Sequence, residues 1–96
     1  MFEQLKFPEE IAKDIAVNEK KKRKKRKMTQ AELSARSGVT LSSLKRFEQT
    51  GEISFVSLLK IAFVLDETER FKELFTSSEY ESIQEVIDEY NQSSVR

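Results

Sequence analysis

The chain contains only two glycines, Gly38 and Gly51, and each follows a short stretch that carries the signals of a helix. Glycine has no Cβ and readily adopts the left-handed conformation that ends many helices. Thr29 and Glu32 have the spacing of a capping box, which starts the helix that Gly38 ends. Thr40 is placed to cap the next helix, which Gly51 ends. The sequence therefore predicts two short helices joined by a tight three-residue turn.

Helix signals also lie on both sides of this pair, and no alternating apolar pattern predicts a strand. Pro8 fits the first turn of a helix, because its missing N–H is not needed there. Ser54 caps a helix that is apolar nearly all round, which we interpret as the central core helix. Further capping patterns at residues 66–69 and 82–85 predict two later helices. We predict an all-α protein of five to six helices, with the polar residues 91–96 disordered.

Positive and negative charges are separated along the chain, although the formal net charge is zero. Residues 1–50 hold 13 Lys/Arg and 7 Asp/Glu, a net charge of +6, whereas residues 51–96 hold 4 and 10, a net charge of −6. Eight successive basic residues, 20–27, concentrate the positive charge. One half of such a chain attracts a polyanion and the other half repels it, which indicates a nucleic-acid-binding face.

The composition excludes several classes of protein. The chain has no His and no Cys, so disulfides, zinc sites with imidazole or thiolate ligands, and His-based catalysis are all excluded. No apolar run approaches the roughly 18 residues of a membrane span. The acidic start, interrupted by Pro8, does not resemble a signal peptide. We therefore expect a cytoplasmic binding protein that has no catalytic residues, no metal and no cofactor.

The predicted helix pair, residues 29–51, has the spacing of a helix-turn-helix, whose second helix lies in the major groove of DNA. The run reads TQAELSARSGVTLSSLKRFEQTG. It resembles the helix-turn-helix of phage repressors and Cro-like proteins, and the resemblance extends from about residue 11 to residue 65. This resemblance implies a lambda-repressor-like fold and binding to double-stranded DNA. The apolar and turn positions of the family are matched by Leu33, Gly38, Val39, Leu44 and Phe47.

We expect the second helix, residues 41–49, to contact DNA bases with the side chains that its buried face leaves outward. Leu44 and Phe47 are three residues apart and form that buried face. Arg46 is the best candidate for contacting guanine, because its planar guanidinium matches two acceptors of that base. Serine hydroxyls bond to either kind of base, and leucine suits the methyl group of thymine. The predicted DNA-binding residues are Gln30, Thr40, Leu41, Ser42, Ser43, Lys45 and Arg46.

The resemblance also implies roles for three individual residues. Gln30 contacts a DNA phosphate and holds the second helix in place. Glu48 matches an acidic residue that often pairs with an arginine of the first helix, and Arg23 stands at the matching position. The chain departs from the family at Glu19 and Lys22, which occupy positions that are commonly apolar. The packing of the first helix is therefore the part of the fold that the resemblance describes least well.

Two stretches have more than one interpretation. The basic run 20–27 contacts phosphates beside the binding site, acts as a nuclear import signal, or is simply solvated, and Lys45 likewise contacts DNA or is solvated. A later apolar stripe has the spacing of one helix face. It either packs against its own domain or forms a surface for a dimer or another partner. The stripe consists of Ile83, Val86, Ile87 and Tyr90.

These observations favour two functions. The first is a homodimeric repressor of a short palindromic operator. The second is an antitoxin that binds a protein toxin and autoregulates its operon, because RFEQTGEISFVSLLKIAFVLDETERFKELF and the later EYESIQEVI resemble small regulators encoded beside Hip-type kinase toxins. In both cases we expect a DNA-binding domain over residues 1–76 and a C-terminal helical extension over residues 77–96.

Overall fold

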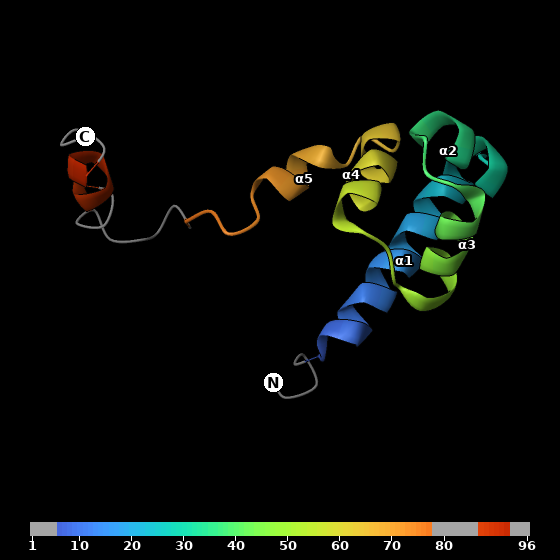
Figure 1. Ribbon diagram of the computed structural model, residues 1–96, viewed down its shortest axis with the longest axis horizontal. Coiled ribbons are helices and arrows are strands. Elements are labelled where there is room, and N and C mark those ends of the chain that lie inside the picture. The colour runs from blue at the N-terminus through green and yellow to red at the C-terminus, as the bar shows by residue number, and fades with distance from the viewer. Residues whose placement is uncertain (1–5, 78–86, 93–96) are drawn as a thin grey trace.

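The computed structural model describes residues 6–77 and 87–92, and this part of the chain is helical without any strand (Figure 1). The prediction of an all-α, lambda-repressor-like fold is confirmed. Residues 87–92 are also helical. The preceding elements are α1 (Pro8–Lys25), α2 (Gln30–Ser37), α3 (Leu41–Thr50), α4 (Phe55–Val64) and α5 (Thr68–Lys72).

The starts of α2, α3 and α4 are capped as the sequence predicts. The Thr29 hydroxyl accepts a hydrogen bond from the backbone N–H of Glu32 at 3.0 Å, and the Thr40 hydroxyl accepts one from Ser43 at 3.2 Å. The Ser54 hydroxyl caps α4 in the same way. Each cap satisfies an N–H group that has no partner within its own helix, which fixes where the helix begins.

Both glycines adopt left-handed conformations and end their helices, with φ of 79° at Gly38 and 82° at Gly51. Gly51 has a second reason to be glycine. A Cβ at this position would lie 2.8 Å from the backbone carbonyl carbon of Ala12, closer than side-chain carbons approach backbone atoms. The end of α3 therefore touches the backbone of α1, and these two helices pack along each other (Figure 1).

A single hydrophobic core joins the first four helices and the residue that follows α4. α1 packs against α3, and α2 packs against both α3 and α4. The partly buried Met28, Ile53, Leu58 and Val64 surround this core. The buried core residues come from all four helices, from the turn between α2 and α3, and from the residue after α4: Ala16, Leu33, Val39, Leu44, Phe47, Ile61 and Leu65.

The interpretation of α4 as a central core helix is wrong. Only Ile61 and Ala62 of this helix are buried, whereas Phe55, Val56 and Phe63 are exposed. The physical reason is position, because α4 lies at the side of the domain, where α2 and α5 contact it and its remaining face meets solvent. Its apolar composition therefore reflects an exposed hydrophobic surface as well as a core contribution.

The prediction for residues 66–69 is also corrected. Glu67 precedes α5 without a side-chain capping bond, and Asp66 has a positive φ of 59°. The Asp66 carboxylate, which the pattern assigned to the cap, instead accepts a hydrogen bond from Arg26 at 2.9 Å. A long-range ion pair has taken the carboxylate that the local pattern assigned to a cap.

The C-terminal predictions are only partly within the described residues. The capping pattern 82–85, Ile83 and Val86 lie outside them, as do residues 93–96. Residues 91 and 92 belong to the helical segment, so the prediction of disorder there is wrong. Among the described residues, no helix combines the length and apolar character that crossing a membrane requires.

Candidate nucleic-acid interface

Buried contacts hold the turn between α2 and α3 in one geometry. Val39 is buried in the core, and its carbonyl oxygen accepts a hydrogen bond from the Ser34 hydroxyl at 2.6 Å. The backbone N–H of Val39 donates to the Ser37 hydroxyl at 3.2 Å. With Gly38 ending α2 and Thr40 capping α3, the backbone of the whole turn is specified. The relative orientation of the two helices is therefore set by the core.

α3 has one buried face and one exposed face. Leu44 and Phe47 are buried, and Phe47 is among the largest fully buried side chains. Leu41, predicted to point outward, is only half-exposed. Thr40 Oγ1 donates to Ser43 Oγ at 2.8 Å, so the Thr40 hydroxyl is engaged in capping. The residues that present exposed side chains along this face are Ser42, Ser43, Lys45 and Arg46.

Arg46 already has a partner on the protein surface, which sequence reasoning missed. Its Nη2 lies 2.8 Å from Oε2 of Glu52, and the two side chains are 68% and 64% exposed. The signal for this pair is Gly51, because a left-handed residue after a helix turns the chain back toward its last turn. An exposed pair of this kind is worth about 0–1 kcal/mol, so Glu52 holds the guanidinium only weakly.

Arg23 and Glu48 lie together on the opposite, buried side of α3. Arg23 Nε and Nη2 donate to the two carboxylate oxygens of Glu48, each at 2.9 Å, and Arg23 Nη1 donates to the Met28 carbonyl oxygen at 2.8 Å. The Arg23 and Glu48 side chains are 7% and 2% exposed. Burial by itself raises the pKa of Glu48, but the hydrogen bonds it accepts outweigh burial and hold that pKa below its ordinary value.

Gln30, at the start of α2, belongs to the same buried network. Its Nε2 donates to Oε1 of Glu48 at 2.9 Å. A glutamine side chain carries two N–H groups on this nitrogen, so one bond to Glu48 leaves the other for a further acceptor. The arrangement connects α1, α2 and α3 through one carboxylate.

Two short helices joined by a fixed turn, with a buried ion pair behind the second helix, are the geometry of a DNA-binding motif. A family model described as Helix-turn-helix matches residues 20–71, more than half of the chain. The chain belongs to this helix-turn-helix family. It is therefore a member of a family of DNA-binding transcriptional regulators. No curated protein and no solved structure matches the chain significantly.

This helix-turn-helix protein has a buried carboxyl group at Glu19, where its family commonly has an apolar residue. The Glu19 side chain is 6% exposed and lies 4.0 Å from Nε of Arg23. Burial, followed by the nearby Glu48 carboxylate, raises the pKa of Glu19 to about 8. The departure at this position thus places a second buried carboxyl group beside the Arg23–Glu48 pair.

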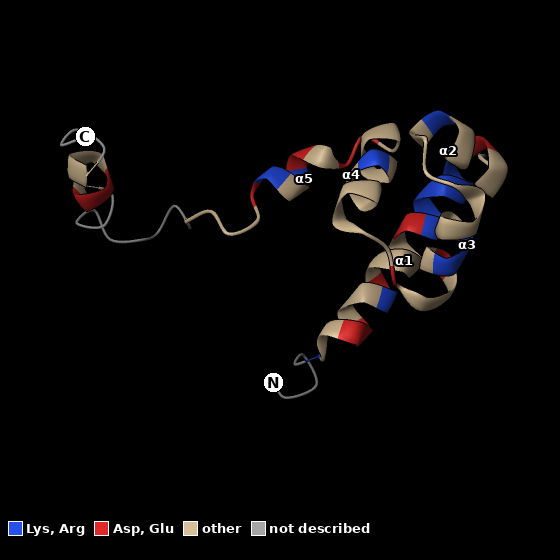
Figure 2. Cartoon of the chain, in the orientation of Figure 1, with Lys and Arg blue, Asp and Glu red and all other residues tan. Residues whose placement is uncertain are grey.

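The second departure, Lys22, is accommodated at the surface. Its Nζ lies 2.7 Å from Glu67, next to α5, and Arg26 Nη1 lies 2.9 Å from Asp66 in the same segment. Arg23 is buried, so Lys22, Arg23 and Arg26 of the basic run 20–27 attach α1 to the rest of the domain. Figure 2 marks the positions of Lys and Arg in blue along the C-terminal half of α1 and on α2 and α3. The remaining five members of the run are exposed: Lys20, Lys21, Lys24, Lys25 and Lys27.

Proposed function

We propose that this helix-turn-helix protein is a sequence-specific repressor that binds a short palindromic operator as a homodimer. The observation that carries the proposal is the exposed face of α3, which presents Ser42, Ser43, Lys45 and Arg46. Phe47 and the buried Arg23–Glu48 pair hold the opposite face of the helix. A helix held this rigidly presents side chains at fixed spacing, which base recognition requires. Residues 1–76 form the DNA-binding domain in this proposal, and the protein acts in the cytoplasm.

Each predicted DNA-binding residue has a role in the proposed complex. Arg46 pairs with a guanine, and Ser42 and Ser43 bond to neighbouring base edges. Leu41 contacts a thymine methyl group at the start of α3. Gln30 keeps its bond to Glu48 and donates its second N–H to a phosphate, which positions the protein but carries no sequence information. The phosphate contacts that flank this site come from Thr40, Lys45 and the exposed lysines of the run 20–27.

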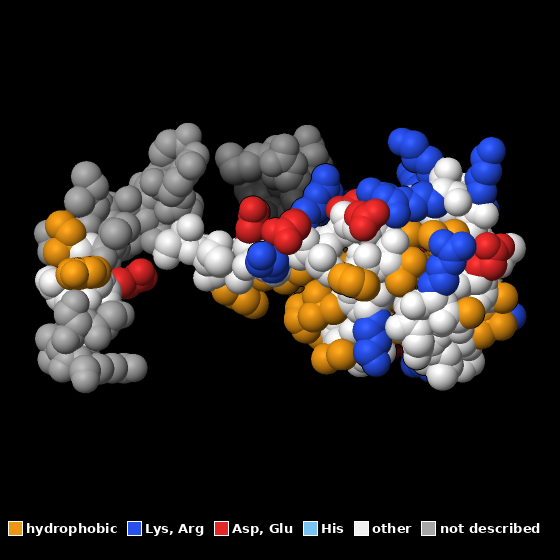
Figure 3. Space-filling view, turned by 90° about the horizontal axis from the view of Figure 1, so that it is seen from above, with side chains coloured by type: hydrophobic (Ala, Val, Ile, Leu, Met, Phe, Trp, Pro, Cys, Tyr) orange, Lys and Arg blue, Asp and Glu red, His pale blue; other side chains and the backbone are white. Residues whose placement is uncertain are grey.

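The exposed hydrophobic side chains of α4 support association with a second copy. Phe55, Val56 and Phe63 are 56%, 62% and 73% exposed, and Figure 3 shows hydrophobic side chains on the surface over α4 and α5. Contiguous apolar surface on a small protein marks an interaction site. A symmetric dimer would place two α3 helices about one DNA turn apart, which matches a palindromic site.

Selection of binding sites from a random duplex pool tests this function. We expect enrichment of an inverted repeat whose half-sites have centres roughly 10 base pairs apart. Enrichment of a single unpaired half-site would argue against the dimer. Failure of any sequence to be enriched over the starting pool would argue against a sequence-specific regulator.

A second candidate function is that of an antitoxin of the Hip type, which binds a protein toxin and autoregulates its operon. The net charge of −6 over residues 51–96 and the exposed apolar surface of α4 favour a protein partner with a basic surface. Co-purification with the product of the adjacent gene distinguishes the two candidates. A stoichiometric complex that releases on high salt supports the antitoxin, whereas a homodimer that binds its operator alone supports the repressor.

A further inference from the structure

Glu19 is a buried carboxyl group to which the proposed DNA contacts assign no role. Neither of its side-chain oxygens is accessible, and no N–H or O–H group placed among the described residues donates to them. The nearest guanidinium nitrogen, Nε of Arg23, is 4.0 Å away, which is too long for a hydrogen bond. An ionised carboxylate buried without donors is strongly disfavoured, so the group needs another way to be satisfied.

Protonation of Glu19 removes the cost of burying its charge. Glu48 accepts bonds from Arg23 and Gln30, and these donors keep it ionised. Glu19 faces the same Arg23 guanidinium as this carboxylate, at 4.0 Å against 2.9 Å, and only its neutral acid form has an O–H to donate toward Glu48. Burial comes first among the causes that raise the pKa of Glu19, followed by the neighbouring Glu48 carboxylate, while the charges of Arg23 and Lys20 act in the opposite direction. One guanidinium is thereby matched by one carboxylate.

We propose that Glu19 is a positioning residue for DNA binding, which acts through Glu48 while it carries this proton. The proposal rests on the proposed DNA-binding function. The protonated carboxyl ties the middle of α1 to the back of α3, and the same Glu48 holds Gln30 at the start of α2. Loss of the proton sets two carboxylates against one guanidinium. Repulsion between Glu19 and Glu48 then shifts α3 and Gln30 away from the spacing that DNA requires.

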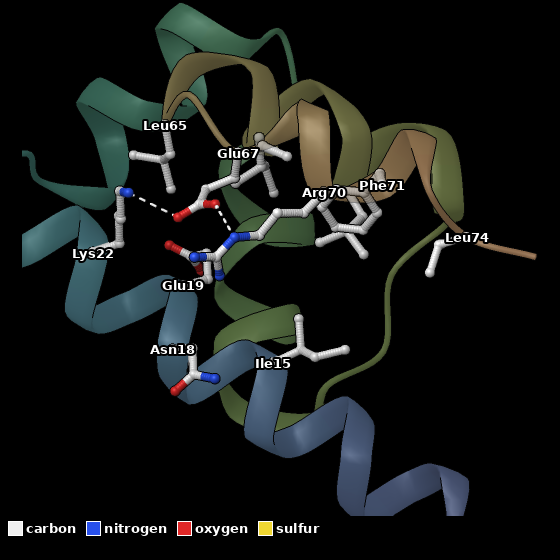
Figure 4. Close-up of a pocket in the computed structure, with 12 residues that line it drawn as sticks. Ile15, Asn18, Glu19, Lys22, Leu65, Glu67, Arg70, Phe71 and Leu74 are labelled. Carbon is white, nitrogen blue, oxygen red and sulfur yellow. Dashed lines mark hydrogen bonds and ion pairs between the residues drawn. The ribbon is translucent and has the colours of Figure 1, made fainter. Parts of the chain in front are cut away.

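The other charges near Glu19 are already matched among themselves. Glu19 is one of the residues that line a pocket of about 290 Å³ between α1, α4 and α5, and Figure 4 shows the charged side chains there. Glu67 accepts contacts from both basic groups of the pocket, from Lys22 at 2.7 Å and from Arg70 at 3.4 Å. The charged groups that surround Glu19 are therefore Lys20, Lys22 and Arg23 of α1, Glu48 of α3, and Glu67 and Arg70 beside or within α5.

The composition makes this proton easy to observe. The chain has no His and no Cys, the two side chains that ordinarily titrate near neutral pH. A change of DNA affinity between pH 7 and pH 9 therefore points to Glu19 or to a chain-terminal amino group. The variant Glu19→Gln separates these two, because it keeps an N–H donor toward Glu48 but has no proton to lose.

The test is fluorescence anisotropy with the duplex that the protein selects, at constant salt from pH 6.5 to pH 9. We expect wild-type affinity to fall about tenfold between pH 7 and pH 9, as one required proton is lost. Glu19→Gln is expected to retain the high affinity at every pH. Glu73→Gln removes the same charge from an exposed position next to α5 and is expected to keep the wild-type profile.

Parallel loss of affinity in the wild type and in Glu19→Gln would overturn the proposal. Carbon-13 NMR titration of the Glu19 carboxyl in the DNA-free wild type gives an independent answer, even where the variant does not fold. A midpoint near 8 supports the protonated state, and a midpoint near the ordinary value of 4.5 overturns it. If the wild type binds no duplex at any pH, the proposed function fails, and the DNA role of Glu19 fails with it. The NMR midpoint still shows in that case whether Glu19 is protonated.

Discussion

Two arginine–glutamate pairs lie on opposite sides of α3, and their distances are nearly identical. Arg23 and Glu48 are 2.9 Å apart on the inner side, and Arg46 and Glu52 are 2.8 Å apart on the outer side. Their environments differ, because the inner side chains are 7% and 2% exposed and the outer ones 68% and 64%. The inner pair has replaced water as the partner of each charge, whereas the outer pair competes with water continuously.

The difference shows that separation alone does not decide what an ion pair does. Removing one partner of a buried pair leaves an unmatched charge in the protein interior, which is costly. Removing one partner of an exposed pair leaves a charge that water solvates. We therefore expect the inner pair to hold α1 and α3 together, and the outer pair to leave the Arg46 guanidinium free for the DNA contact that we propose.

The largest expected effect comes from breaking the inner pair. Arg23→Leu leaves the buried Glu48 carboxylate without its guanidinium and is expected to lower the free energy of unfolding by about 3–5 kcal/mol. Arg46→Leu, the same change on the outer side, is expected to cost about 1 kcal/mol or less. Urea unfolding of both variants measures this contrast, and equal losses would contradict it.

Glu48→Gln is expected to cost less than Arg23→Leu, because Glu19 is close enough to pair with Arg23 instead.

The inner pair and the neighbouring Glu19 also predict an unusual dependence of stability on pH. The pKa of Glu19 is raised to about 8, so the stability that this group contributes is complete below pH 4.5 and is lost as pH rises through 8. The pKa of Glu48 is lowered, so its contribution is present above the ordinary carboxyl value and is lost at more acidic pH. The free energy of unfolding is expected to decline by up to about 1.4 kcal/mol per pH unit between pH 5 and pH 8.

Urea unfolding at pH 5, 6, 7 and 8 measures this decline. Glu19→Gln is expected to remove most of it, because the amide does not titrate. The exposed carboxylates of the outer side, such as Glu52, are expected to add little to the slope because water screens them. A wild-type protein whose stability is constant or rises from pH 5 to pH 8 would show that Glu19 is ionised in the folded state.

A smaller effect is expected from the exposed lysines of α1, which belong to neither pair. Replacing Lys20, Lys21, Lys24 and Lys25 with Gln is expected to flatten the dependence of DNA affinity on salt. Each lost phosphate contact changes the slope of log K against log salt by about 0.9. Sequence preference is expected to stay intact, because a phosphate is the same at every base pair. An unchanged slope would show that these lysines are solvated and do not touch DNA.

Local signals predicted the fold well because the helix boundaries depend on residues close in sequence. Thr40 caps α3 three residues before its partner, and Gly51 ends the same helix through its own backbone conformation. A search along the sequence finds such signals. The buried face of α3 was predicted for the same reason, because Leu44 and Phe47 have helical spacing.

The missed features depend on contacts between distant parts of the chain. The Arg26–Asp66 bond joins residues 40 positions apart, and it removed Asp66 from the cap that the local pattern indicated. Glu19 was recognised as a departure from the family, but its place beside Glu48 depends on how α1 packs against α3. The exposed face of α4 depends on how few helices surround it. Composition alone cannot distinguish that surface from a core.

The most direct test of the account is whether Arg46 selects a base while Gln30 only positions the protein. The measurement is a competition titration of Arg46→Ala and Gln30→Ala across single-base variants of the selected duplex, at fixed salt. Arg46→Ala is expected to cost about 1–3 kcal/mol and to lose discrimination at one base pair per half-site. Gln30→Ala is expected to weaken all duplexes about equally. A uniform loss for Arg46→Ala with an intact base profile would contradict the account, because the outer side of α3 would then contact only the DNA backbone through Arg46.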